Sequence, residues 1–275
     1  MTIILKYAIR PMRRWTSVVL MVCLCAGTAT LAHANTADEY RSLSKELEQL
    51  VAEATPDRST VRLSNKKVAE LISTLSVSQH ILEATTYQIE NLGTLMDICG
   101  SANAVVMSYM LFDLKNSVNS KTDPTSVAHQ VQKVMENNLL AFQEELGQLQ
   151  PFLLRCMAKQ IPLMTAFMKS LKPEELTDIR RAGLQQHRDG VFNVYFGFLQ
   201  NTNNPSLKES YRAKVLQTLA ETATEYSSVL KPTARQQIIS LANSVGLNTT
   251  NVFHQYLDAI IKAMTESACN GICIL

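Results

Sequence analysis

The stretch TADEYRSLSKELEQLVAEATP, residues 36–56, decides the fold class of this chain. Its apolar residues recur every three or four positions, which is the spacing of one helix face and not of a strand. The members of this stripe are Tyr40, Leu43, Leu47, Leu50, Val51 and Ala54. Two acids lie in the first turn, where they suit the helix dipole, and Thr-Pro-Asp at 55–57 ends the pattern. We therefore expect a helix over this stretch.

The same spacing continues along the chain, and no segment alternates for long enough to predict a strand. Gly100 and Ser101 are expected to separate two helices, and Pro151 is expected to begin a helix that is kinked at Pro162. The expected helices cover residues 64–99, 102–118, 126–150, 151 onward, 173 onward, 207–230, 233–245 and 249–268. The chain is thus predicted to be all-α, as a multi-helix bundle or a short helical array.

Short matching blocks suggest a duplicated helical unit in the C-terminal half. Leu-Lys-Pro at 171–173 recurs at 230–232, with Ile179 and Ile238 at the same offset. Val-Phe-X-X-Tyr occurs at both 191–195 and 252–256. A duplication would explain these matches, and so would chance matching in a leucine-rich helical chain.

The first 34 residues have the three parts of a secretory signal peptide. Basic residues without any acid come first, an apolar run covers residues 16–31, and Ala-His-Ala at 32–34 ends it. We expect cleavage after Ala34, because the apolar run falls short of the roughly 20 residues that span a bilayer. The remainder, residues 35–275, is predicted to be a single all-helical domain without a transmembrane segment. A sub-boundary, if there is one, would fall near residues 119–125.

Other readings of the N-terminus are open but less favoured. Translation could start at Met12 instead of Met1. The pair Arg13-Arg14 is compatible with twin-arginine export, but the residues that follow continue that signal poorly. Cys23 could be a lipidation site, but the preceding Val22 is not the small residue that such a site needs. We therefore expect Sec-type export and a periplasmic or secreted protein.

The charge balance argues against nucleic-acid binding. The chain has 26 Lys and Arg against 24 Asp and Glu, and four of the basic residues lie in the signal. The mature chain therefore has 22 basic and 24 acidic residues, a net charge of −2. No run of Lys or Arg remains to hold a phosphate backbone or an anionic membrane.

Four cysteines remain after the signal, and an even count in an exported chain favours disulfides. Of the three connectivities, we favour Cys99–Cys156 with Cys269–Cys273. Cys156 shares an apolar stripe, and Cys99 lies beside Gly100, where a bridge is sterically easy. In the loop-entropy model the long bridge would stabilise by roughly 4 kcal/mol and the short one by roughly 2 kcal/mol.

The C-terminal sequence SACNGICIL allows several readings of Cys269 and Cys273. A prenylation box would need the cysteine one position earlier, and a thioredoxin pair would need two intervening residues instead of three. A zinc site lacks a second pair, since only His254 is near. A local staple at the end of the last helix is favoured, with Gly271 making the turn.

No catalytic, metal or cofactor motif stands out, so none is predicted. The stretch QHRDG groups a base, a cation and an acid at His187, Arg188 and Asp189, but adjacent helical residues point different ways. A solvated helix face is the favoured reading. An enzyme of an unrecognised helical class stays open as an alternative, with His187, Asp189, Glu174 or Glu175 as its candidates.

The function that these observations favour is an exported, non-enzymatic interaction protein, such as an adaptor, chaperone, inhibitor or immunity-type protein. Its partner would be another protein. A second hypothesis is a helical carrier of an apolar ligand, with a cavity near Met107 and Met164. Methionines on apolar stripes usually fill the core, but they also line adaptable grooves.

Overall fold

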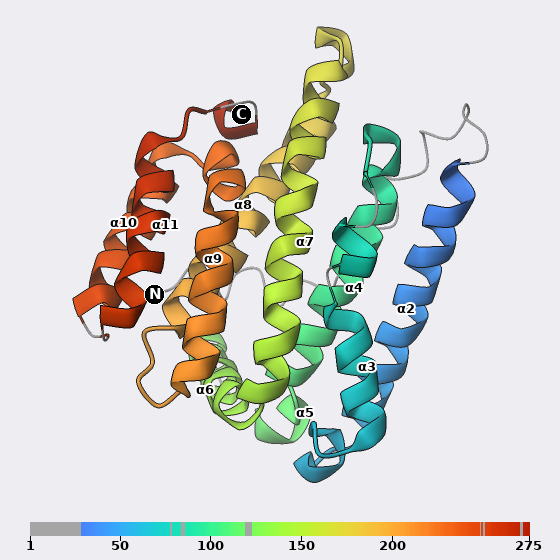
Figure 1. The fold of residues 1–275 in the computed structure, drawn as a ribbon, viewed down its shortest axis with the longest axis vertical. Helices are drawn as coiled ribbons and strands as arrows, with labels where there is room; N and C mark the ends of the chain where they lie inside the picture. The colour runs from blue at the N-terminus through green and yellow to red at the C-terminus, as the bar shows by residue number, and fades with distance from the viewer. Residues whose placement is uncertain are drawn as a thin grey trace.

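The computed structural model describes residues 29–77, 79–83, 86–118, 123–247, 249, 251–269 and 272–275. These residues form helices and short helical turns, and no strand occurs among them (Figure 1). The predicted all-α multi-helix bundle is confirmed. Residues 1–28 of the expected signal peptide lie outside the described part, and Ala34 lies within the first described helix. No helix among the described residues is long and apolar enough to cross a membrane.

The α-helices are α2 (Ala29–Glu53), α3 (Lys66–Ser76), α4 (Leu92–Met110), α5 (Leu114–Ser117), α6 (Pro124–Ala141), α7 (Gln143–Ser170), α8 (Asp178–Asn201), α9 (Glu209–Val229), α10 (Pro232–Leu247) and α11 (His254–Glu266). Short 3-10 or π turns occur at η2 (Arg58–Val61), η3 (Gln79–Glu83), η4 (Ile89–Asn91), η5 (Pro173–Glu175), η6 (Asn251–Phe253) and η7 (Ile272–Ile274).

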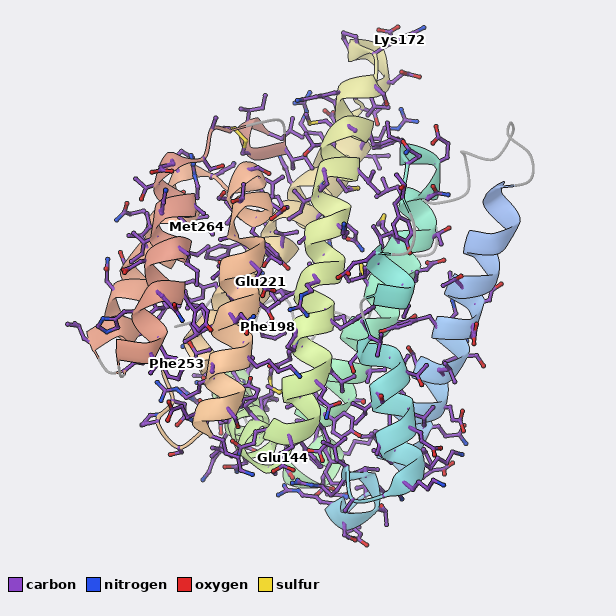
Figure 2. All side chains as sticks on the ribbon, in the orientation of Figure 1. Glu144, Lys172, Phe198, Glu221, Phe253 and Met264 are labelled. Carbon is purple, nitrogen blue, oxygen red and sulfur yellow. A yellow bond between two sulfur atoms is a disulfide. The ribbon has the colours of Figure 1, made fainter. Side chains whose placement is uncertain are left out.

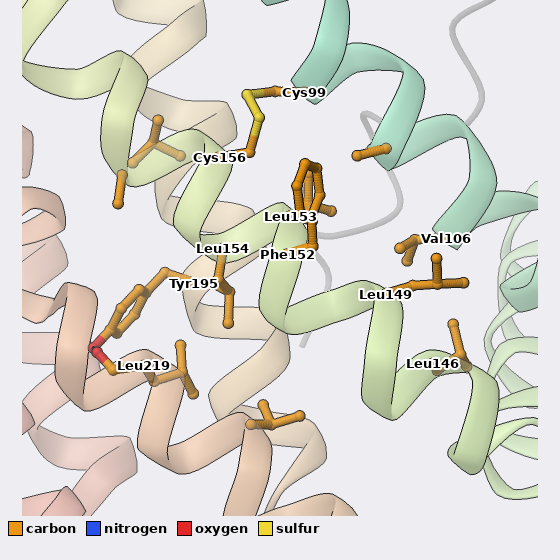
Figure 3. Close-up of a cluster of buried hydrophobic side chains, with 14 of the residues drawn as sticks. Cys99, Val106, Leu146, Leu149, Phe152, Leu153, Leu154, Cys156, Tyr195 and Leu219 are labelled. Atoms are coloured by element: carbon orange, nitrogen blue, oxygen red, sulfur yellow. A yellow bond between two sulfur atoms is a disulfide. The ribbon is translucent and has the colours of Figure 1, made fainter. Parts of the chain in front are cut away.

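Helix α7 lies at the centre of the bundle (Figure 1). On one side it packs against α3 and α4, and α4 in turn packs against α2. On the other side it packs against α9, which is covered by α8 and α11, and α10 lies against α8 and α11. The buried apolar residues form one cluster that extends from Ala37 in α2 to Ile272 in η7. The core around α7 includes the Cys99–Cys156 disulfide, Leu149 and Leu153 (Figure 3).

The break in the central helices falls at Phe142 and not at Pro151, so the predicted boundary is wrong. α7 continues through both Pro151 and Pro162. The Phe142 ring is fully buried against Tyr109 and Phe112, at 5.1 and 5.3 Å between ring centroids. Burial of this ring fixes the turn there, and packing of α7 on both sides offsets the roughly 3 kcal/mol that a proline costs inside a helix.

The helix expected over residues 64–99 is also divided differently. α3 ends at Ser76, two short turns follow, and α4 then runs through Gly100 and Ser101 without interruption. Gly100 is exposed, whereas Cys99 and Ala102 on either side are buried. Burial of its neighbours thus outweighs the roughly 1 kcal/mol penalty of a helical glycine.

The structure gives the duplicated unit no support. The Leu-Lys-Pro block at 171–173 leads into η5, whereas the block at 230–232 leads directly into α10. Ile179 is 76% exposed and its counterpart Ile238 is 0% exposed. Val191 is buried within α8, whereas Val252 is exposed in η6. Identical residues in the matching blocks therefore occupy different structural environments, as expected if the matches arise by chance.

Candidate functional site

A cleft of about 300 Å³ opens between α7, α9 and η3. Its apolar residues are Leu82, Ala158 and Pro162, and Thr222 also lines it. The other lining residues are the cations Arg155 and Lys159 and the acids Glu83, Glu221 and Glu225. Five of the nine lining residues are therefore charged, around an apolar patch.

The two long walls of this cleft carry opposite charges. Both cations come from α7, where they are four residues apart, and two of the acids have the same spacing on α9. Residues four apart lie on one helix face, so each wall presents a pair of like charges. Glu221 can be seen on α9 beside α7 in Figure 2.

One pair of opposite charges forms an ion pair across the cleft, whereas the pair one turn further along does not. Arg155 Nη2 lies 2.8 Å from Glu221 Oε2, and Gln217 donates a hydrogen bond to the other oxygen of Glu221 at 2.8 Å. Lys159 and Glu225 also line the cleft, about one helical turn further along α7 and α9. Among the described residues, neither Lys159 nor Glu225 takes part in an ion pair. These two charges are therefore available to a bound group.

Sequence reasoning missed this cleft, although it carries a signal. Like charges four residues apart weaken an isolated helix. The pairs Arg155 with Lys159 and Glu221 with Glu225 break that rule on two helices. Only the packing of α7 against α9 shows that the two pairs face one another.

A second, more open groove of about 500 Å³ lies between α8 and α10. Phe196 and Leu241 provide its apolar part, and polar side chains of α10 provide the rest. The Phe196 ring packs against Phe192 one turn earlier, at 5.3 Å between centroids. Most of this groove is therefore a solvated helix face beside one aromatic pair.

The QHRDG stretch is partly buried, so the predicted solvated face is wrong for Arg188. This residue is 7% exposed, and its guanidinium pairs with Asp189 Oδ1 at 3.0 Å. Arg188 Nη1 also donates to the backbone oxygen of Ile272 at 3.5 Å, and Gln185 donates to that of Leu275 at 2.9 Å. This part of α8 therefore holds the C-terminal turn in place.

His187 points into the protein instead of into a reaction site. Its Nε2 atom is buried and has no hydrogen-bond partner among the described residues. Burial disfavours the charged imidazolium and lowers the pKa of His187 to about 4. The ring is therefore neutral at physiological pH.

The other enzyme candidates do not converge on His187. Glu174 and Glu175 lie exposed in η5, and Glu175 accepts a hydrogen bond from the backbone of Lys172 at 2.8 Å. Lys172 lies at one extremity of the molecule (Figure 2). His187 comes nine residues after the start of α8 at Asp178, which is about 13 Å along the helix axis. These groups form no common site in the described part of the chain.

The methionine regions do not line either cleft. Met164 is 7% exposed and belongs to the apolar core, and Met107 is half-buried on α4. The described residues also contain no group of three His, Cys, Asp or Glu side chains placed to hold a metal ion. The positions of these two methionines therefore do not support the carrier hypothesis.

The structure pairs Cys99 with Cys156 and Cys269 with Cys273, as the sequence analysis favours. The short bridge does not lock the end of the last helix, however. α11 ends at Glu266, and Cys273 lies in the separate turn η7. Gly271 lies outside the described residues. The short bridge therefore closes a turn that follows the helix.

Comparison with protein-family models, with curated proteins and with solved structures finds no match for this chain.

Proposed function

We propose that this chain is a non-enzymatic interaction protein of the adaptor, chaperone, inhibitor or immunity type, which engages a polypeptide partner through the cleft between α7 and α9. The observation that carries this proposal is the pair of oppositely charged walls around an apolar patch. A partner segment with one apolar side chain between an acid and a base would complement it. Lys159 would pair with the acid of the partner, and Glu225 with its base.

The composition of the cleft favours a polypeptide over a small apolar ligand. Small-molecule sites are mostly apolar, with few polar groups, whereas charged residues are the majority in this lining. Arg155 and Glu221 keep side-chain exposures of 34% and 42% even though they pair with each other. Such solvated charges set the specificity and association rate of an encounter more than its affinity. They suit a reversible contact with a partner chain.

We also propose that the protein is exported by the Sec route and works in the periplasm or outside the cell. The two disulfides support an oxidising compartment. Cell fractionation with N-terminal sequencing tests this part. The mature chain should begin at Asn35, after Ala34, and a cytoplasmic chain that retains its first residues would contradict export.

The partner contact is tested by reversing one charge in the cleft. A photoreactive amino acid at Glu83, an exposed residue of the cleft lining, should crosslink the partner in the envelope fraction in a one-to-one complex. Lys159→Glu should reduce that crosslink about tenfold, because a carboxylate at position 159 would repel the partner acid that Lys159 is proposed to pair with. Lys133→Glu, an exposed charge on α6, serves as the matched control and should leave the crosslink unchanged.

Two outcomes would contradict the proposal. One is equal crosslinking in Lys159→Glu and Lys133→Glu, which would remove the cleft from the contact. The other is the absence of any one-to-one crosslinked polypeptide when the protein is expressed at its natural level.

A further inference from the structure

The two disulfides differ in how far solvent reaches them. In the long bridge, Cys99 is 3% exposed and Cys156 is 0% exposed. In the short bridge, Cys273 is 4% exposed but Cys269 is exposed. Thiol–disulfide exchange requires a thiolate to reach a sulfur atom, so access decides which bridge can react. Cys269 is the accessible member of the four.

The short bridge lies in a segment that packs against α8 and α9. We define the C-terminal segment as residues 267–269 and 272–275. Its buried residues are Ile272 and Cys273, which are 0% and 4% exposed, and Leu275 packs against the core. Its polar anchors are the contacts from Gln185 and Arg188 on α8, and a hydrogen bond from Arg235 on α10 to the backbone oxygen of Ser267.

We propose that Cys269–Cys273 is a thiol–disulfide exchange site for a dithiol reductant, and that its reduction releases the C-terminal segment from α8 and α9. This inference goes beyond the proposed function, because it does not depend on the charged cleft. A small dithiol and the dithiol motif of a reductase both fit this role, since the exchange chemistry is the same.

The exchange takes two steps. A thiolate of the reductant attacks Cys269 Sγ and forms a mixed disulfide, while the bond to Cys273 Sγ breaks and its electron pair leaves on Cys273 as a thiolate. That thiolate takes up a proton. The second thiolate of the reductant then attacks the reductant's other sulfur atom in the mixed disulfide, and Cys269 leaves as a thiolate that takes up a second proton. The reductant ends as a disulfide and the protein as two thiols, a two-electron exchange.

Arg188 favours the first step. Its guanidinium contacts the backbone oxygen of Ile272, so a positive charge lies next to the residue that becomes the thiolate. A nearby cation stabilises a thiolate. Asp189 offsets part of this charge, but its side chain is 48% exposed, whereas that of Arg188 is 8% exposed. The more buried charge is the one less screened by water.

Reduction would let the segment open more often because the bridge no longer holds Cys269 to Cys273. Opening a five-residue loop lets its ends move apart in the open state, which favours opening about thirtyfold in the loop-entropy model. The segment leaves the face of α8 that carries Gln185 and Arg188, and the site of Ile272 becomes open to another apolar side chain. The site beneath the segment thus becomes available about thirtyfold more often after reduction.

The test compares the two bridges within one molecule. The oxidised full chain is treated with increasing dithiothreitol under native conditions, and free thiols are alkylated and assigned by peptide mass spectrometry. Cys269 and Cys273 should be labelled at least about tenfold faster than Cys99 and Cys156, because only the short bridge is accessible. Equal labelling rates, or faster labelling of the long bridge, would overturn the exchange site.

Release is measured separately by hydrogen exchange. The amide of Leu275, which donates to Ile272 in the closed turn, should exchange about thirtyfold faster after selective reduction. The double variant Cys269→Ser with Cys273→Ser should show the same fast exchange without reductant. Exchange in either sample at the rate of the oxidised protein would overturn the release of the segment.

Discussion

His187 makes the stability of this protein depend on pH in a way that one substitution should remove. Burial holds the pKa of His187 at about 4, against 6.5 for a solvated imidazole. The unfolded chain therefore binds a proton at a higher pH than the folded chain does. Neutral His187 contributes stability that is fully present above pH 6.5 and is lost as the pH falls through about 4.

The size of this loss follows from the shift. A difference of one pKa unit corresponds to about 1.4 kcal/mol, so the full loss is about 3 kcal/mol well below pH 4. At pH 4.5 the unfolded imidazole is charged and the folded one is still mostly neutral, which gives about 2 kcal/mol. His187→Gln should abolish this part, because the amide does not titrate.

Urea denaturation at pH 7 and pH 4.5, followed by circular dichroism, measures the effect. The wild type should lose about 2 kcal/mol more between the two pH values than His187→Gln does. Carboxylates also titrate in this range, but their contributions are common to both proteins and cancel. His129→Gln is the matched control, because His129 lies exposed on α6, and it should lose as much as the wild type.

Equal losses in the wild type and His187→Gln would refute the reasoning. They would mean that the imidazole gains a proton in the folded state as easily as in the unfolded state. A buried and unpartnered Nε2 atom is incompatible with that result.

Three further substitutions test the packing around α7. Replacing Cys99 and Cys156 by Ala should lower the free energy of unfolding, measured by urea denaturation, by about 4 kcal/mol. A loss smaller than the roughly 2 kcal/mol expected for the short bridge would contradict the loop-entropy argument. Tyr211→Phe removes the 2.5 Å hydrogen bond to Gln150 Oε1. Because Gln150 is 0% exposed, we expect the free energy of unfolding, measured in the same way, to fall by about 1–3 kcal/mol. An unchanged urea midpoint would show that water replaces the hydroxyl. Asn138→Ala removes two hydrogen bonds, at 3.1 and 2.8 Å, to the backbone carbonyls of Met110 and Phe112 at the end of α4. It should lower the melting temperature by several degrees, and a shift within error would argue against this anchor.

The sequence predicts the fold class well because the helical period is a local property. The stripe in residues 36–56 becomes the buried face of α2, with Tyr40, Leu47 and Val51 in the core. The expected end of this helix at 55–57 also agrees with the structure, where α2 ends at Glu53. Each of these features depends on neighbours within one or two turns of chain.

The helix boundaries that failed depend on residues distant in sequence. Pro151 resembles a helix start, and nothing near it shows that the chain is held helical by α4 on one side and α9 on the other. Phe142 resembles any apolar helical residue, and it ends α6 only because Tyr109 and Phe112 enclose its ring. Local propensity is outweighed wherever packing of this size opposes it.

The sequence by itself determined that the chain is all-α and favoured one of three disulfide connectivities, because the helical period is a local property of the order of residues. Only the tertiary structure decided that the cations of α7 face the acids of α9, and that Arg188 holds the C-terminal turn. Those contacts join residues 66 and 84 positions apart. The reason is that the order of residues shows which face of a helix is apolar or charged, but not which other helix packs against that face.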